Sequence, residues 1–138
     1  MAMKHPIQIK TRLVCRGEEG EETIERTYRG TWTRHERRHL LHYVDEENCG
    51  ETYVLLSPSQ ADLRRRGQAV SRMVLADGFL HESDYVTPAG TFPLGVRTES
   101  YVLSLTPAGG RLHAVYVIEV GGVAVSRNEL WLTWNYLN

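Results

Sequence analysis

The chain has 138 residues, 41% hydrophobic and 24% charged, and its 16 Lys and Arg against 17 Asp and Glu give a formal net charge of −1. Such values are typical of a globular domain, and they exclude a disordered chain or a strongly basic nucleic-acid-binding protein. The length suits one domain, so residues 1–138 are expected to form a single unit.

The N-terminal residues 1–10, MAMKHPIQIK, lack the apolar core of a secretion signal. No apolar run in the sequence approaches the length that crosses a bilayer. A cytoplasmic location without a membrane partner is therefore expected. Cys15 and Cys49 are too few for a disulfide scaffold or a zinc motif, and free thiols are expected.

Short segments with alternating polarity lie between regularly spaced turn signals. Residues 7–15 carry Ile7, Ile9 and Leu13 on one face, and residues 23–33 carry Ile24, Tyr28 and Trp32 in the same way. A period of two is typical of a half-buried strand. Turn signals recur at residues 17–20, 46–50, 57–59, 67, 77–78, 88–90, 107–110 and 121–122. This spacing predicts an all-β domain, most simply a closed or nearly closed barrel.

Two stretches, residues 34–45 and 60–75, leave strand and helix open. Residues 33–36 (TRHE) have the form of a helix capping box, and apolar residues follow at helix-compatible spacing. Residues 60–75 also place apolar side chains on one side of a helix. Gly67 in the middle of that helix would cost about 1 kcal/mol relative to Ala.

The clearest element is a hairpin formed by residues 111–120 and 123–134 around Gly121 and Gly122. Two glycines can supply the positive φ angles of a two-residue type I′ turn. In such a loop the residues that flank the turn pair directly, so the residue numbers of any two paired positions add up to 243. This register predicts which side chains of the hairpin share a face.

The register places Tyr116 opposite Arg127 and Val115 opposite Asn128. We therefore expect Tyr116 and Arg127 to face any cavity together, and Asn128 to have a structural role on the other side of the sheet. A Tyr116→Phe change should then weaken ligand binding while leaving thermal stability nearly intact.

Four short motifs follow one another in the C-terminal half: Tyr85-x-Thr87-Pro88-x-Gly90, Leu94-Gly95, Gly110-x-Leu112-x-x-x-Tyr116 and Ser126-x-Asn128-x-Leu130. The N-terminal half adds Ile7-x-Ile9, the basic segment Arg34–Arg38 and the turn Arg65-Arg66-Gly67. In order and spacing the chain resembles the YwiB-like family of small bacterial proteins of unknown function. The resemblance implies a calycin-like (lipocalin-type) β-barrel, an antiparallel meander of roughly eight to ten strands with both open stretches as β-hairpins. It implies no catalytic residue.

His35, His39 and His42 would share a face and could bind zinc only on a helix. On a strand, His39 and His42 point to opposite faces. We interpret the three as solvated hairpin histidines and expect neither a metal nor another cofactor.

No nucleophile elbow, P-loop or dinucleotide fingerprint occurs in the sequence. Enzymatic activity is therefore not favoured. Ionisable residues of the expected strands are general acid–base candidates by residue type alone, namely Asp84, Glu99, Glu119 and Glu129.

The first functional hypothesis is a barrel that binds a small, partly apolar and acidic ligand in its interior. Barrels of this size can hold one small molecule, and ligand pockets combine apolar walls with a few polar groups. A Tyr–Arg pair could clamp a carboxylate. The candidate ligand-binding residues are Tyr85, Arg97, Tyr116 and Arg127.

The alternative is an interaction module whose exterior contacts RNA or another phosphate-rich partner. Two arginine groups at expected hairpin tips would form a positive patch if the tips lie close together. Charges at such tips also keep strands from pairing edge to edge, which is the simpler explanation. The candidate phosphate contacts are Arg34, Arg37, Arg38, Arg64 and Arg65.

Overall fold

A computed structural model of the protein describes residues 3–47 and 49–137, and within these residues the regular structure consists of ten β-strands. The strands are β1 (Lys4–Gly17), β2 (Gly20–His35), β3 (Arg38–Asp45), β4 (Gly50–Leu56), β5 (Ala61–Gly67), β6 (Ser71–Leu75), β7 (Leu80–Thr87), β8 (Gly90–Thr106), β9 (Gly109–Val120) and β10 (Val123–Tyr136). The expected all-β fold is confirmed. The described residues contain no helix that could cross a membrane.

All ten strands belong to one antiparallel sheet in the order β6-β5-β4-β3-β2-β1-β10-β9-β8-β7. The first and last strands of the chain are neighbours in its middle, and β6 and β7 meet at a seam. There Val70 and Val86 exchange two backbone hydrogen bonds of 2.8 and 2.9 Å. The Ser83 hydroxyl donates a third bond to the Arg72 carbonyl oxygen at 2.9 Å. These contacts make the barrel nearly closed. That the barrel is of the calycin type stays a prediction.

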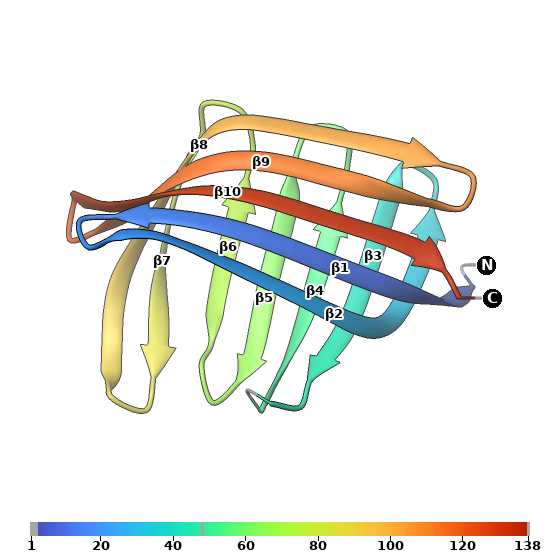
Figure 1. Ribbon diagram of the computed structural model, residues 1–138, viewed down its shortest axis with the longest axis horizontal. Coiled ribbons are helices and arrows are strands. Elements are labelled where there is room, and N and C mark those ends of the chain that lie inside the picture. Colours follow the sequence, from blue (N-terminus) through green and yellow to red (C-terminus); the bar gives the residue numbers. More distant parts are fainter. Residues whose placement is uncertain (1–2, 48, 138) are drawn as a thin grey trace.

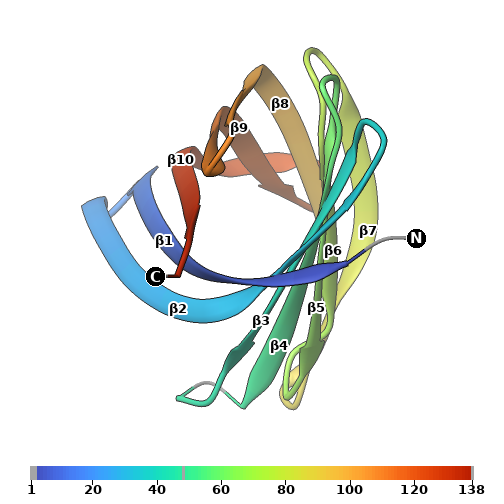
Figure 2. The same cartoon turned by 90° about the vertical axis from the view of Figure 1, so that its right-hand side faces the viewer.

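The strands form two layers that run across each other. In Figure 1, β8, β9, β10, β1 and β2 lie in front, and β3 to β7 cross behind them. The long strands β2 and β8 curve from one layer into the other, and Figure 2 shows the sheet bending around a common interior. A bulge between Thr98 and Ser100 interrupts β8 along this path, and bulges bend a strand. In β2, a Cβ at Gly30 would clash with the His42 carbonyl oxygen, so the close approach there requires glycine.

Large apolar side chains fill the centre of the barrel. Trp32 and Trp134 are fully buried and meet edge to face, with ring centroids 5.6 Å apart. A Cβ at Gly110 would overlap the Trp134 ring, so glycine permits this packing. Burying a large apolar side chain contributes about 1.5–3 kcal/mol each. The inward positions that the alternation predicted on β1 and β2 are confirmed, among them Ile7, Ile9 and Trp32.

The histidines of β3 lie on opposite faces of the strand, as the alternation requires. His39 is buried, and its Nδ1 accepts a hydrogen bond from Trp32 Nε1 at 3.1 Å. Burial, together with the nearby Arg34 cation, lowers the pKa of His39. The prediction of solvated histidines is therefore wrong for His39. His42 points outward, stacks on Tyr53 at 4.4 Å, and its Nε2 lies 3.0 Å from a Glu51 carboxylate oxygen.

Both stretches that the sequence left open are β-hairpins. Residues 34–45 belong to the end of β2 and to β3, and residues 61–75 hold β5 and β6. The helix alternatives are wrong because the side chains alternate, with Leu41 inside and Leu40 outside. Gly67 has a φ of 134°, which a residue with a side chain rarely adopts. It ends β5 before the turn.

The C-terminal hairpin has the expected turn but not the expected register. Gly121 and Gly122 have φ angles of 60° and 81°. Val120 pairs with Val123 as predicted, and then a bulge at Val125 adds one residue to β10. An extra residue moves every later side chain to the other face.

Tyr116 consequently pairs with Asn128, and Arg127 pairs with Val117. The prediction that Tyr116 and Arg127 share a face is wrong. Tyr116 and Asn128 both point inward, with 4% and 2% of their surface exposed. Burial raises the pKa of Tyr116.

Candidate functional site

The four residues expected to bind a ligand inside the barrel lie in different places. Tyr116 is inside, whereas Tyr85 is partly exposed in the β7–β8 hairpin and pairs with Phe92. Arg97 and Arg127 are on the outer surface. Arg97 Nε donates to Glu119 at 3.2 Å, and Arg127 Nη2 donates to Glu99 at 2.8 Å. The structure therefore does not bring this set together as one interior site.

The arginines expected to contact phosphates form two separate groups. Arg34, Arg37 and Arg38 lie at the β2–β3 hairpin, where the Arg34 guanidinium covers the Trp32 ring at 4.1 Å. Arg65 lies level with Tyr43, near the other end of β3, because the two residues occupy the same row of paired positions across the sheet. Five residues along a strand separate the two groups by about 17 Å. The condition that the two tips lie close together is not met.

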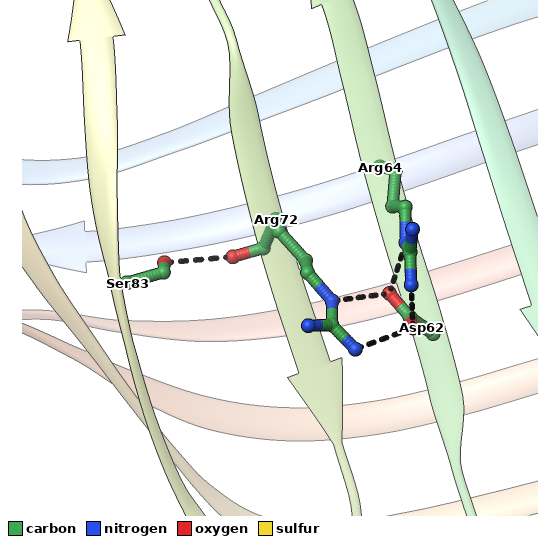
Figure 3. Close-up of polar contacts among 4 residues, drawn as sticks. All are labelled: Asp62, Arg64, Arg72 and Ser83. Carbon is green, nitrogen blue, oxygen red and sulfur yellow. Dashed lines mark hydrogen bonds and ion pairs between the residues drawn. The ribbon is translucent and has the colours of Figure 1, made fainter.

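Arg64 instead joins a cluster with Asp62 and Arg72 on the outer face of β5 and β6. Arg64 and Arg72 are directly paired across the two strands. The Asp62 carboxylate lies between them and accepts two hydrogen bonds from each guanidinium, at 3.3 and 3.2 Å from Arg64 and at 3.2 and 2.9 Å from Arg72 (Figure 3). Two like charges directly opposite each other repel. The carboxylate allows both arginines to occupy this pair.

The three charges of this cluster have unequal exposure. The Asp62 side chain is 8% exposed, whereas Arg64 and Arg72 are 58% and 49% exposed. Burial alone would raise the pKa of Asp62, but the hydrogen bonds from Arg72 and Arg64 outweigh it and hold this pKa below its usual value. The same contact raises the pKa of Arg72. Asp62 is therefore a fixed anion at neutral pH, suited to positioning cations and not to accepting a proton.

The cluster lies in a surface groove of about 680 Å³, which we call the arginine groove. Its charged lining consists of Arg64, Arg65, Arg66, Arg72, Asp62 and Asp84. Arg65 shares the inward face of β5 with Ala61 and is paired with Asp45 at 3.9 Å, so three outward cations against two anions leave the groove positive. The apolar part of the lining is formed by Leu40, Tyr53, Leu55 and Val70.

Tyr53 forms one wall of the arginine groove within a stack of side chains. The His42 ring lies against it at 4.4 Å, and the Arg66 guanidinium lies over its ring at 5.0 Å. Glu51 pairs with both neighbours, at 3.0 Å from His42 and at 3.7 Å from Arg66. The outer face of β4 and β5 therefore holds its side chains in fixed positions beside the cluster. Guanidinium groups bind carboxylate and phosphate in a planar fork, so this arrangement suits an anion with an apolar body.

Sequence reasoning missed Asp62 and Arg72, although it selected Arg64. Their contact depends on the register of the β5–β6 hairpin, in a stretch where helix and strand were both open. The available signal was the spacing of Asp62 and Arg64, which share a face on a strand but not on a helix.

The fold and the groove define a class of protein: a small, nearly closed barrel of ten antiparallel strands with an arginine-lined groove on its outer wall. The chain belongs to the family described as domain of unknown function DUF1934, whose model matches residues 7–132. The crystal structure of the ywiB protein from Bacillus subtilis is similar over 98% of this chain and 94% of that chain, with a TM-score of 0.87 and 20% identity. This confirms the YwiB-like resemblance and, at such identity, shows the fold alone. No curated protein gives a significant match.

Proposed function

We propose that the protein is a binding module that takes a small, partly apolar acid in the arginine groove. A carboxylate or phosphate of the ligand contacts Arg64 and Arg72, and its apolar part packs on Leu40, Leu55 and Tyr53. This keeps the ligand class expected from the sequence and moves its place from the interior to the outer wall. A cytoplasmic location is part of the same proposal.

The shared carboxylate of Asp62 is the observation that supports this proposal. One carboxylate is shared by two guanidinium groups that face each other, so the three side chains together keep a net positive charge. Each guanidinium has five N–H donors, and Asp62 accepts two bonds from each. Both arginines are half-exposed, and their remaining donors are available to a ligand in the groove.

The test compares two variants that lower the net charge by the same amount. The triple variant Asp62→Asn, Arg64→Gln, Arg72→Gln replaces the whole cluster with neutral groups of similar shape, so no buried charge is left without a partner. The control Arg37→Gln removes one cation at the β2–β3 hairpin. Anilinonaphthalene sulfonate, a fluorescent and partly apolar anion, is the probe, and native mass spectrometry of freshly purified protein detects a co-purified ligand.

We expect the triple variant to bind the probe at least about tenfold more weakly, because a hydrogen bond to a charged group contributes about 1.5–3 kcal/mol. The Arg37→Gln control should bind as the unchanged protein does. Equal binding by the triple variant and the unchanged protein would place the ligand elsewhere, for example inside the barrel, and would refute the groove as the site.

A further inference from the structure

A second surface lies on the other layer of the barrel, on the outer face of β2, β1, β10 and β9, the front layer of Figure 1. Its side chains form two neighbouring rows across the strands. Residues in such rows share a face. We call this surface the Trp131 face, and its rows are Thr27, Lys10, Thr133 and Arg111, and Glu25, Arg12, Trp131 and His113.

Trp131 is held between a cation and a second ring. The Arg12 guanidinium lies over its ring at 5.0 Å, and the His113 ring lies at 5.2 Å with a tilt of 35°. Glu129 fixes His113 through a contact of 2.7 Å to Nε2. Arg12 and His113 form the outer ends of this stack and are 52% and 33% exposed. Nucleic-acid bases stack on both guanidinium planes and aromatic rings, so the stack can be extended by a base.

Two grooves meet at Trp131 and Thr133. One has a volume of about 410 Å³ and is lined by Lys10, Arg12, Arg26 and Glu25, among others. The other has a volume of about 620 Å³ and contains Arg111 and His113. On the outer face the joined grooves carry the cations Lys10, Arg12 and Arg111. The carboxylates beside them are Glu25, which pairs with Arg12 at 3.5 Å, and Glu129, which contacts His113.

Lys10 and Arg111 are the exposed cations of the first row, and within the described residues neither has an ion-pair partner. They lie two strands apart, on either side of Thr133, at a distance of about 10 Å between backbones. A stack of planar groups beside two such cations matches the general chemistry of single-stranded nucleic-acid sites, where rings hold bases and cations hold phosphates.

We propose that the Trp131 face binds single-stranded nucleic acid, with a base on the Arg12–Trp131–His113 stack and phosphates on Lys10 and Arg111. The partner is chosen by charge complementarity and by the stack, beside which Lys10 and Arg111 have no ion-pair partner among the described residues. This proposal does not depend on the proposed function, because the two surfaces lie on different layers and share no residue.

The experiment measures the fluorescence anisotropy of labelled oligo(dT) and oligo(U) at increasing salt concentrations. The double variant Lys10→Gln, Arg111→Gln is compared with Arg37→Gln, Arg38→Gln, which removes the same charge from the β2–β3 hairpin. We expect the slope of log affinity against log salt to become shallower by about 0.7 for each lost phosphate contact in the double variant. The hairpin variant should keep the slope of the unchanged protein.

The stacking role is tested by Trp131→Ala, with His113→Leu as a second variant in case the first does not fold. Loss of a stacked base should weaken binding by roughly 5- to 150-fold at constant salt, with little change in the salt slope. No binding of either oligonucleotide at low salt overturns the proposal. Equal loss in the Arg37→Gln, Arg38→Gln variant also overturns it, because the hairpin arginines would then hold the nucleic acid.

Discussion

Replacing Asp62 with Asn should destabilise the protein and strengthen its binding of anions. The substitution keeps the shape of the side chain but removes the negative charge between Arg64 and Arg72. All four hydrogen bonds to the carboxylate, between 2.9 and 3.3 Å, then lose their ionic acceptor. The two directly paired guanidinium groups are left facing each other across neighbouring strands.

The size of the stability loss follows from the exposure of the three groups. Breaking a fully buried ion pair costs about 3–5 kcal/mol, and breaking an exposed pair costs at most about 1 kcal/mol. Asp62 is nearly buried, whereas both arginines are half-exposed. An intermediate loss of about 1–2 kcal/mol is therefore expected. In a domain of this size that loss lowers Tm by about 3–10 °C.

The loss should also depend on pH in a defined way. The pKa of Asp62 in the folded protein lies below its usual value. Stability from this carboxylate is therefore fully present above the unfolded pKa of about 3.9, and it disappears as the pH falls through the folded pKa. Urea unfolding of both proteins should give a constant difference from about pH 5 to 8 and a smaller difference below about pH 4.

Anion binding should change in the opposite direction. Without the Asp62 charge, the arginine groove keeps the outward cations Arg64, Arg66 and Arg72 against one carboxylate, and anilinonaphthalene sulfonate should bind more tightly. A variant of unchanged stability would show that the carboxylate does not hold the arginine pair together. Weaker probe binding in a folded Asp62→Asn protein would refute the idea that the groove recognises anions by its excess positive charge.

Two further substitutions test the packing of the barrel by urea unfolding, and one deletion tests the β10 bulge by near-UV circular dichroism. Gly110→Ala should cost about 1–3 kcal/mol, because the added methyl group overlaps the Trp134 ring. His39→Leu should cost about 1–3 kcal/mol, since it leaves the buried Trp32 N–H without an acceptor. The unchanged protein should lose stability below about pH 6.5, because the pKa of His39 is lowered in the folded state and protonation favours the unfolded chain. The His39→Leu variant should not show this loss. Deletion of Val125 removes the β10 bulge but leaves the pairs beyond it, such as Asn128 with Tyr116, in place, so the native near-UV circular dichroism spectrum should be kept.

The face of each N-terminal strand could be predicted from the sequence because it depends on local alternation. Ile7 and Ile9 alternate with polar residues, and both are fully buried. The turn at Gly121 and Gly122 was predictable for the same reason, since two adjacent glycines favour positive φ angles. Such features depend on the conformational preferences of a few residues and need no knowledge of distant parts of the chain.

The bulge at Val125 had no such signal. Its sequence context, VAVSRN, contains no glycine and continues the pattern of a regular strand. The bulge places the polar Asn128 beside Tyr116 inside the barrel, where its side-chain amide donates to the Ser126 hydroxyl at 3.0 Å. A register count that assumes regular pairing necessarily assigns every residue beyond the bulge to the wrong face.

The position of the candidate site follows from which charges neutralise each other. Inside the barrel, Arg65 and Asp45 lie within 3.9 Å of each other, which offsets one inward cation with one inward anion. On the outer wall, Arg64 and Arg72 share one carboxylate, so the register of β5 and β6 produces an unbalanced positive charge there. Excess charge of one sign raises the local concentration of oppositely charged ligands. The strand register, which no short motif encodes, therefore places the unbalanced positive charge on the outer surface of the barrel.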